Sequence, residues 1–352
     1  MGFESGGDLG DLEVLVRRAS PGAVIRLKAG IYNLRRPLHI TKPISLVGEG
    51  IKKTRIVCPA MGYVLRFSGK GVFQATDIGF FHTGQAWGNV VEVESGEVIL
   101  QRCRFVGGKW SAAEKRGGVG LWLRGKARGK IEHCEAANNR LAGIRVSDKA
   151  HALIRECTLQ ENGYGIIYKD DAAGQAELNL CSQNGVGMVI TDRAKPVLRG
   201  NVCKLSSYYG VLVSGQAQPL LERNLCQKNK AAGICYLDSA GGVARSNECS
   251  ANEIRGIELA GKARPKLEEN RCLQNEDGIV YWENAAGIAR RNLCRHNICG
   301  IGVADKARPI LEANICSDNR LFGIRILRTA QPTLKGNRCE GNGQQDVRDE
   351  RR

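Results

Sequence analysis

Four aspartates at equivalent turns of successive repeats are the best catalytic candidates in the chain. They are Asp148, Asp170, Asp171 and Asp192. Paired carboxylates can act as general acid and base in glycoside hydrolysis, and carboxylate oxygens are the ligands that Ca²⁺ prefers. The alternative is that each aspartate stabilises its turn. The pattern therefore leaves two hypotheses open, a hydrolase or calcium site and a purely structural role.

Basic residues recur in a shared register of turns and indicate a polyanion-binding edge. The members of this basic edge are Lys126, Arg128, Lys149, Arg193, Lys195, Lys262, Arg264, Lys306 and Arg308. With a net charge of +16, such an edge could attract nucleic acid or an acidic polysaccharide. Some turns in the same register carry no basic residue, and no aromatic residues are interleaved for base stacking. The alternative is a solvated edge that prevents aggregation.

A stripe of apolar residues occupies positions that are expected to point outward. Its members are Ile167, Val189, Leu212, Cys235, Leu237, Val280 and Trp282. Because a contiguous exposed apolar patch usually marks an interface, we expect a protein partner or self-association here. The alternatives are a loop that covers the stripe and β-branched residues that merely suit a strand. In the two outward columns, counted from Trp122 onward, Glu258 is the only carboxylate, which disfavours acid–base catalysis on this face.

Two insertions interrupt the repeat before the same sheet and carry aromatic and basic residues. The predicted recognition residues are Trp87, Lys109, Trp110, Lys115, Arg116 and Trp122. Insertions on one face of a solenoid are often binding elements, and this group could stack on a sugar or hold a peptide. The alternative is a small satellite core beneath the loops.

The cysteines and histidines predict no metal site and no cofactor. No Cys-x-x-Cys pair occurs, and the five histidines are scattered, whereas zinc sites need clustered ligands. The chain has 14 cysteines but neither an export signal nor an apolar run long enough to span a membrane. We therefore expect reduced thiols and a cytoplasmic, bacterial protein without membrane association.

These candidate residues are positioned by a repeat of nearly constant length. Cysteine recurs every 22 to 24 residues from Cys134 to Cys339; from Cys181 onward it stands in the phrase Asn-x-Cys, usually with a second Asn three residues after the cysteine. A Gly-Ile-x-Val phrase follows, and often a Pro-x-Leu phrase. Fixed self-similarity at this period is the signature of a solenoid.

Each repeat contains three short apolar segments with period-2 alternation, which predicts strands rather than helices. A repeat of 22–23 residues suits one triangular coil of three parallel strands, and successive coils lie about 4.8 Å apart. The sequence therefore predicts an all-β solenoid of about 12 coils.

Stacked coils would place equivalent residues in columns, which explains the residue types. A corner Asn can adopt the left-handed backbone conformation, and stacked Asn side chains can hydrogen-bond along the column. The Gly of each Gly-Ile pair permits a bend. Cysteine serves as a small apolar core residue.

Three segments are predicted along the chain. Residues 1–20 contain an amphipathic capping helix from Asp8 to Ala19, because a solenoid must cover its end with an atypical unit. Residues 21–343 form the solenoid. Residues 344–352 are a charged tail without stable structure.

The opening phrases, Pro21-Gly22-Ala23-Val24-Ile25-Arg26-Leu27, Gly30-Ile31-Tyr32 and Leu46-Val47-Gly48-Glu49-Gly50, resemble the start of pectin-lyase-like right-handed parallel β-helix proteins. The repeats resemble those of the carbohydrate-binding and sugar-hydrolysis superfamily, in particular its NosD-type and F-box-receptor-type members. The resemblance spans about residues 20–345. It implies a right-handed β-helix, and it leaves function open among lyases, hydrolases, epimerases and non-catalytic scaffolds. The Gly-His-Gly and Arg-Ile-Lys motifs of polygalacturonase-like hydrolases are missing.

The function predicted from these observations is a non-catalytic scaffold that binds a protein partner through the apolar stripe and the inserted loops. A carbohydrate-binding protein, or a polysaccharide hydrolase or lyase, is the alternative. Binding of nucleic acid or another polyanion along the basic edge is a third hypothesis.

Overall fold

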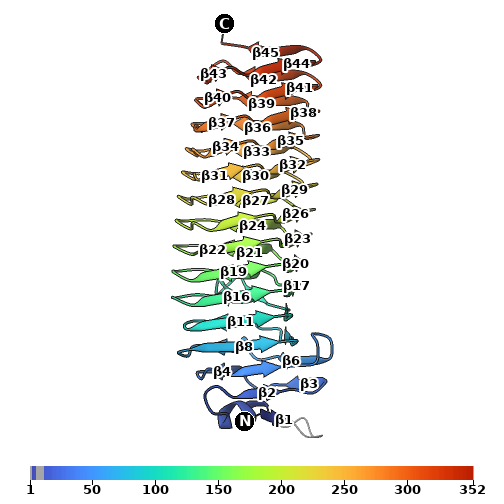
Figure 1. The fold of residues 1–352 in the computed structure, drawn as a ribbon, viewed down its shortest axis with the longest axis vertical. Helices are drawn as coiled ribbons and strands as arrows, with labels where there is room; N and C mark the ends of the chain where they lie inside the picture. Colours follow the sequence, from blue (N-terminus) through green and yellow to red (C-terminus); the bar gives the residue numbers. More distant parts are fainter. Residues whose placement is uncertain (1, 5–11, 352) are drawn as a thin grey trace. The chain divides into compact units, whose positions relative to one another are not determined.

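The computed structural model describes residues 2–4 and 12–351. The chain divides into two compact units, unit 1 (Met1–Leu180) and unit 2 (Cys181–Arg352), which are described separately. Short parallel strands form sheets A, B and C in each unit, apart from one small antiparallel hairpin in unit 1. Figure 1 colours unit 1 from blue to green and unit 2 from green to red.

Unit 1 contains helix α1 (Leu12–Arg18) and the first half of the strands. Sheet A consists of β1 (Gly2–Glu4), β2 (Val24–Arg26), β5 (Ser45–Val47), β8 (Val72–Thr76), β11 (Glu97–Gln101), β16 (Arg128–Glu132), β19 (His151–Arg155) and β22 (Ala173–Glu177). Sheet B consists of β3 (Gly30–Asn33), β6 (Thr54–Cys58), β9 (Gly79–His82), β12 (Arg104–Val106), β17 (Glu135–Ala137) and β20 (Thr158–Gln160). Sheet C consists of β4 (Leu38–Ile40), β7 (Gly62–Phe67), β10 (Gly88–Val93), β15 (Val119–Leu123), β18 (Ala142–Val146) and β21 (Tyr164–Tyr168). The hairpin pairs β13 (Trp110–Ser111) with β14 (Arg116–Gly117).

Unit 2 repeats the same order of sheets. Its sheet A strands are β25 (Val197–Arg199), β28 (Leu220–Glu222), β31 (Val243–Arg245), β34 (Lys266–Glu268), β37 (Ile288–Arg290), β40 (Ile310–Glu312) and β43 (Thr333–Lys335). The sheet B strands are β26 (Val202–Lys204), β29 (Leu225–Gln227), β32 (Glu248–Ser250), β35 (Arg271–Leu273), β38 (Leu293–Arg295), β41 (Ile315–Ser317) and β44 (Arg338–Glu340), and β23 (Leu180–Ser182) begins at the last residue of unit 1. The sheet C strands are β24 (Val186–Ile190), β27 (Val211–Val213), β30 (Ala232–Tyr236), β33 (Arg255–Leu259), β36 (Asp277–Tyr281), β39 (Cys299–Val303), β42 (Phe322–Ile326) and β45 (Gln345–Asp349).

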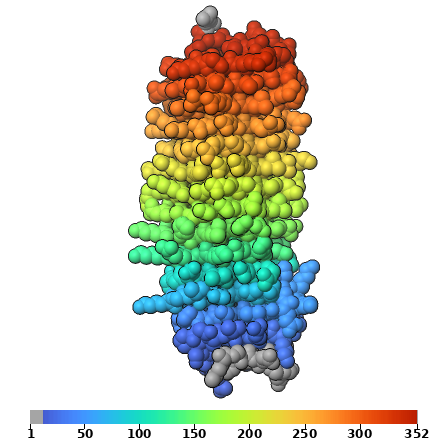
Figure 2. All heavy atoms as spheres, viewed as in Figure 1, coloured from blue at the N-terminus to red at the C-terminus, as the bar shows by residue number. Residues whose placement is uncertain are grey.

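This topology confirms the predicted all-β parallel solenoid with three strands per coil. Counted over the described residues of both units, the sheets contain 15, 14 and 14 strands, so these residues form about 14 coils rather than 12. The difference arises before Cys134, where the cysteine period is absent and coils are harder to count. Figure 2 shows the side chains of successive coils as parallel bands across the visible face of each unit.

The core of each unit consists of apolar columns that run from coil to coil. Within sheet C of unit 2, Ile257, Ile279 and Ile301 occupy paired positions and are 0% exposed. The neighbouring residues in each strand point outward, as the period of a β-strand requires. Burial on one face therefore sets the register of every coil.

Two asparagine ladders hold the corners of the coils. In unit 2, the side-chain nitrogen of Asn224 donates to the side-chain oxygen of Asn247 at 3.0 Å, and Asn247 donates in the same way to Asn270 at 2.9 Å. The left-handed residue is the one before each ladder asparagine, for example Arg223 (φ 53°) and Ser246 (φ 54°). The predicted ladder is present, whereas the prediction that the asparagine itself is left-handed is wrong.

The ten periodic cysteines from Cys134 to Cys339 occupy two different positions, although the sequence suggested one column. In unit 2, Cys203, Cys226 and Cys249 face the core at the centre of sheet B strands. In unit 1, Cys134 and Cys157 lie at a ladder corner, where the backbone N–H of Cys157 donates to the side-chain oxygen of Asn179 at 2.9 Å. The gap from Cys157 to Cys181 is 24 residues, which is close to the repeat length. The spacing alone therefore does not reveal this change of position.

The two ends of the described chain differ from the predicted segments. Helix α1 is present with Leu12 and Val16 buried, but residues 8–11 of the predicted helix lie outside the described residues. Residues Gln345–Asp349 form β45, paired in register with β42, so the prediction of an unstructured tail is wrong there. Val347, flanked by polar residues, continues the column of Ile324, and this alternation is the pattern of a strand.

Candidate functional site

The candidate aspartates lie in turns, where they hold neighbouring turns together. Asp148 accepts a hydrogen bond from the backbone N–H of Gly125 at 2.7 Å, and Asp170 accepts one from the N–H of Asp148 at 3.2 Å. Asp171 donates its backbone N–H to the carbonyl of Asp148 at 2.9 Å. In unit 2, Asp192 has the same left-handed conformation, with φ of 59°. These carboxylate contacts give Asp148 and Asp170 a structural role.

The apolar stripe is not an open surface in either unit. In unit 1, Ile167 is 7% exposed. In unit 2, Val189 is 9% exposed, Cys235 and Val280 are buried, and the remaining members are half-buried, namely Leu212, Leu237 and Trp282. With four of its seven members buried, the stripe offers no contiguous exposed apolar patch of the kind that marks an interface.

The predicted loop residues pack on one another beside sheet C of unit 1. Trp110 and Arg116 are on the hairpin β13–β14, and the Arg116 guanidinium lies 5.1 Å from the centre of the Trp87 ring. Trp110 is 37% exposed. The two basic residues Lys109 and Lys115 are exposed at the same hairpin. The inserted loops therefore present two partly covered tryptophans, Trp87 and Trp110, together with exposed cations.

Sheet C of unit 1 carries a network of ion pairs on its outer face. Arg66 contacts Glu92 at 2.7 Å and Glu94 at 3.3 Å, and Arg124 also pairs with Glu94. The side-chain nitrogen of Asn89 donates to Glu92 at 2.7 Å. The cations of this network are thus already neutralised by carboxylates, which reduces their attraction for an external anion.

Trp122 continues this network toward the next coil. Its indole N–H donates to the hydroxyl of Ser147 at 2.9 Å. The guanidinium groups of Arg124 and Arg145 lie 4.8 and 4.7 Å from its ring centre, within cation–π range. Burial lowers the pKa of Arg145, while Asp170 and Asp148 oppose this effect.

The first members of this column were not predicted, because outward positions were counted only from Trp122. Arg66 and Glu92 pair in register, and Glu92 pairs with Trp122. The signal was present in the segments 62–67 and 88–93, where polar residues alternate with apolar ones after a glycine. Counted from there, the outward column of sheet C in unit 1 carries Arg66, Glu92, Trp122 and Arg145 before it becomes apolar at Ile167.

The outer face of sheet C in unit 2 contains a second polar group. Arg255 contacts Glu258 at 2.8 Å and lies 5.0 Å from the ring centre of Trp282. Asp277, in register with Arg255, has its pKa raised by burial, with a further rise from Glu276, while Arg255 lowers it. Glu258 therefore lies within a group of polar side chains. The count of the two outward columns had suggested that this carboxylate was isolated.

The residues of the predicted basic edge are exposed in both units. Lys126, Arg128 and Lys149 belong to unit 1, and the other members belong to unit 2. The alanine between the basic residues of each turn points inward, as shown by Ala263 and Ala307, which are 0% exposed. This buried alanine directs the flanking cations toward solvent.

Part of this edge lines a groove in unit 2. The groove has a volume of about 560 Å³ and is lined by Gln218, Ser239, Ala240, Gly241, Gly242, Val243, Lys262, Arg264 and Lys266. We call it the cationic groove. Its three cations are exposed, and no carboxylate is among its lining residues. Lys262 and Arg264 were predicted from the sequence, whereas Lys266 was missed because it lies on β34 beyond the turn motif.

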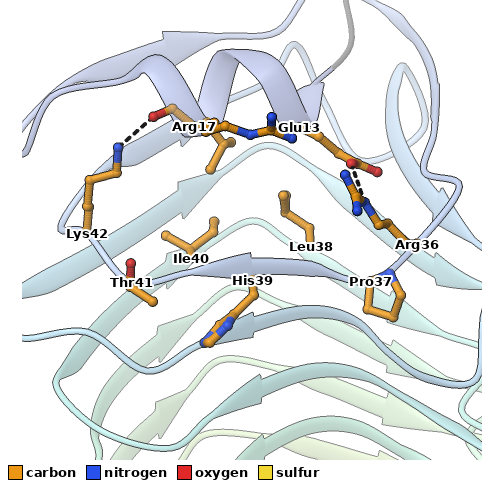
Figure 3. A pocket seen from close by; sticks show the side chains of 10 residues that line it. Glu13, Arg17, Arg36, Pro37, Leu38, His39, Ile40, Thr41 and Lys42 are labelled. Atoms are coloured by element: carbon orange, nitrogen blue, oxygen red, sulfur yellow. Dashed lines mark hydrogen bonds and ion pairs between the residues drawn. The ribbon is translucent and has the colours of Figure 1, made fainter.

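A smaller groove in unit 1 differs from the cationic groove in charge. It has a volume of about 280 Å³ and lies between α1 and β4 (Figure 3). Arg36 pairs with Glu13 at 3.0 Å, and Lys42 donates to the carbonyl oxygens of Arg17 and Ala19 at 2.9 and 2.6 Å. These two contacts tie the helix to the solenoid. Arg36 and Lys42 therefore already have partners, and Glu13 places a carboxylate in this groove.

Within residues 2–4 and 12–351, no group of three or more His, Cys, Asp or Glu side chains is arranged to hold a metal ion. In the same part of the chain, no helix has the length and apolar character needed to cross a membrane.

The sequence matches the family described as "Right handed beta helix region" over residues 62–202 and 176–305. The chain belongs to this family, which confirms the predicted resemblance and the right-handed parallel β-helix. No curated protein matches the sequence.

Several solved structures share the fold. The periplasmic alginate epimerase AlgG is 15% identical, with 95% of this chain and 89% of that chain covered and a TM-score of 0.61. The A-module of the mannuronan C-5 epimerase AlgE6 from Azotobacter vinelandii is 13% identical, with 97% and 95% covered and a TM-score of 0.57. A mannuronic acid specific polysaccharide family 6 lyase from human gut microbiota is 15% identical, with 95% and 82% covered and a TM-score of 0.62.

These comparisons bear on two predictions. The structures of the same fold include polysaccharide-acting enzymes, which agrees with the carbohydrate alternative and gives no support to a protein-binding scaffold. The prediction of a cytoplasmic protein is contradicted by the likeness to a periplasmic enzyme. The absence of a recognisable export signal in the sequence was a weak basis for that prediction.

Proposed function

We propose that the protein binds an acidic polysaccharide in the cationic groove of unit 2. The observation that carries the proposal is the lining of this groove, in which Lys262, Arg264 and Lys266 are exposed and no carboxylate is present. A polymer with a carboxylate on each sugar would provide the missing counter-charges. Arg264 can hold a carboxylate through two parallel hydrogen bonds, whereas the lysines act as point charges.

Charge pairing elsewhere in unit 2 supports this choice of groove. On the neighbouring strands, Glu222 binds both Arg199, at 2.8 Å, and Arg245. Arg271 pairs with Glu248 at 3.4 Å. Cations with such partners gain little from an external anion, because the carboxylate already occupies the guanidinium. The three groove cations lack such neighbours among the groove-lining residues.

The neutral groups of the groove favour a sugar over a nucleic acid. Gln218 and Ser239 line the groove beside the cations and can both donate and accept hydrogen bonds, as sugar hydroxyl groups require. No aromatic side chain lines the groove, although single-stranded nucleic acids are usually held by stacking on aromatic rings. The polysaccharide-acting enzymes that share the fold support the same choice.

The basic edge continues beyond the groove within unit 2. Lys306 and Arg308 follow Lys262 and Arg264 two coils later, as the turn contacts from Gly261 through Glu283 to Asp305 show. Two strand spacings correspond to about 9–10 Å. A polymer that lies along this edge would meet a further pair of cations, and several weak contacts along one chain raise the overall affinity.

A titration of a polyuronate oligosaccharide by isothermal calorimetry tests this function. The matched control ligand is the same oligosaccharide after its carboxyl groups have been reduced to alcohols. We expect binding of the acidic form only, with an affinity that falls as salt rises, because salt screens exposed charges. Equal binding of both forms, or no binding at low salt, would refute the proposal. Stronger binding of mixed single-stranded DNA would instead assign the groove to nucleic acid.

A further inference from the structure

The cationic groove exists because one coil lacks a side chain that its neighbours carry. Gln218, Gly241 and Arg264 hold equivalent positions, since the backbone N–H of each donates to the carbonyl of a buried alanine one coil earlier, at 3.1, 2.9 and 2.9 Å. The accepting residues are, in the same order, Ala194, Ala217 and Ala240. The exposed side chains of Gln218 and Arg264 therefore flank a gap over Gly241 that is one side chain wide.

The backbone at Gly241 does not itself require a glycine. A Cβ at this position would approach no atom closer than the Cγ of Gln218, at 3.8 Å, and the φ of Gly241 lies outside the left-handed region. Ala286 holds the equivalent position two coils later, where its N–H donates to the carbonyl of Ala263 at 2.9 Å. The fold therefore accepts a side chain here, and the gap depends only on the residue type at position 241.

Gly242 adds a backbone donor to the same gap. Its equivalents on the adjacent coils are prolines: the N–H of Val243 donates to the carbonyl of Pro219 at 3.0 Å. The N–H of Lys266, which follows Pro265, donates in the same way to the carbonyl of Gly242 at 3.0 Å. Proline has no N–H, whereas the N–H of Gly242 is present and has no acceptor among the described residues. A groove-lining N–H beside exposed cations can donate to an anionic oxygen.

We propose that the gap over Gly241 and Gly242 is a slot for the carboxylate of a single sugar, and that Gly241 determines the specificity of the groove. The carboxylate enters over Gly241, accepts a hydrogen bond from the Gly242 N–H and pairs with the guanidinium of Arg264. This inference rests on the proposed function for its choice of ligand. It deepens that function, because a few fixed polar groups in a shaped site then recognise one uronate residue, whereas attraction along the basic edge alone depends on many contacts with a long polymer.

The variant Gly241→Gln tests the slot without changing any charge. We expect its affinity for a labelled polyuronate oligosaccharide to fall by about tenfold or more, because the added side chain fills the gap and excludes the carboxylate. The matched control is Gly302→Gln, which adds the same side chain at a glycine of unit 2 outside the groove, where a Cβ would approach nothing closer than 3.7 Å. The control should stay within about threefold of the original affinity. Thermal unfolding should show both variants folded like the original chain.

Displacement by a monosaccharide tests whether one sugar is recognised by itself. The methyl glycoside of the uronic acid is added to the complex with the labelled oligosaccharide, and sodium chloride at the same ionic strength is the control. We expect the glycoside to displace the oligosaccharide well beyond the weakening that salt causes by screening. In protein labelled with ¹⁵N-glycine, the amide proton resonance of Gly242 should shift on addition of the glycoside, and Gly241→Gln should abolish that shift.

Three results overturn the slot: full affinity of Gly241→Gln, displacement by the glycoside no greater than by salt, or an unchanged Gly242 amide resonance. If the original chain in that case still binds the acidic oligosaccharide and not its reduced form, the proposed function stands and only the slot is lost. If the original chain binds no oligosaccharide at low salt, the proposed function fails and the slot fails with it.

Discussion

The side-chain oxygen of Asn247 accepts two hydrogen bonds from Asn224, one from its backbone N–H at 2.9 Å and one from its side-chain nitrogen at 3.0 Å. Asn247 also donates to the carbonyl of Leu221 at 2.9 Å and is 0% exposed. With its bond to Asn270, this one side chain serves polar groups of three other residues in a dry corner. The same contacts repeat at Asn270, Asn292 and Asn314, which explains why asparagine recurs in this ladder.

Replacing this ladder member should destabilise unit 2. Asn247→Ala leaves the backbone N–H of Asn224 without the side-chain acceptor and removes one donor from the carbonyl of Leu221, and a buried unsatisfied group costs about 1–3 kcal/mol. We expect a loss of roughly 2–4 kcal/mol by thermal unfolding and faster hydrogen exchange at the Asn224 amide. The control is Asn342→Ala, at a half-buried position where water can replace the lost bonds. Equal losses for the two variants would contradict this account of the ladder.

Two glycines of sheet C should respond differently to an added methyl group. A Cβ at Gly233 would lie 2.8 Å from both the Cβ of Cys249 and the carbonyl oxygen of Gly256, whereas a Cβ at Gly302 would approach nothing closer than 3.7 Å. Overpacking of a core costs about 1–3 kcal/mol, so Gly233→Ala should lower the unfolding temperature. Gly302→Ala should change stability by less than about 0.5 kcal/mol, as most surface substitutions do. If Gly233→Ala leaves the unfolding temperature unchanged, the buried cysteine column can accommodate an added methyl group.

Asp277 should make the folded state less stable as the pH rises. Burial, with a smaller contribution from Glu276, raises its pKa above the ordinary value of 3.8, although Arg255 and Arg325 oppose this shift. The folded state therefore favours the neutral acid. The resulting stabilisation is complete below the unfolded pKa and is lost as the pH rises through the folded pKa. Asp277→Asn should consequently raise the unfolding temperature at neutral pH and have little effect in acid.

Glu222 provides the opposite sign as a control for this pH experiment. Hydrogen bonds from Arg199 and Arg245 lower its pKa, so its contribution is present above the unfolded pKa and is lost as the pH falls through the folded pKa. Glu222→Gln should therefore lower the unfolding temperature at neutral pH, and the difference should disappear in acid. If both variants shift stability in the same direction at neutral pH, the assigned pKa directions are wrong.

The repeat was sufficient to predict the fold, because the residues that define it are the ones that pack between coils. The Gly-Ile-x-Val phrase places the isoleucine in a buried column, as at Ile257 and Ile279, and the asparagines form the ladders. The period did not reveal which column a cysteine joins. Cys157 and Cys203 have the same spacing pattern but occupy a corner and a strand centre, respectively.

The candidate site was harder to predict because exposed residues follow no period. Lys262 and Arg264 were found through their turn motif, but Lys266 joins them only because β34 follows that turn directly. The exposure of the apolar stripe was overestimated. Position in the sequence indicates the direction in which a side chain points, but not which groups cover it. Neutralisation of Arg66 by Glu92 depends on strand register, which the irregular coils of unit 1 obscured.

The most direct test of the central claim compares two triple charge reversals by fluorescence anisotropy with a labelled polyuronate oligosaccharide. The groove variant carries Lys262→Glu, Arg264→Glu and Lys266→Glu. The control carries Arg223→Glu, Lys228→Glu and Lys230→Glu, which change the net charge equally at exposed turns elsewhere in unit 2. We predict that the groove variant loses about 100-fold in affinity, because charged hydrogen bonds contribute about 1.5–3 kcal/mol each and exposure reduces this value. The control should stay within about threefold of the original affinity, since only long-range attraction changes. Equal losses in both variants, or full affinity in a correctly folded groove variant, would contradict the claim.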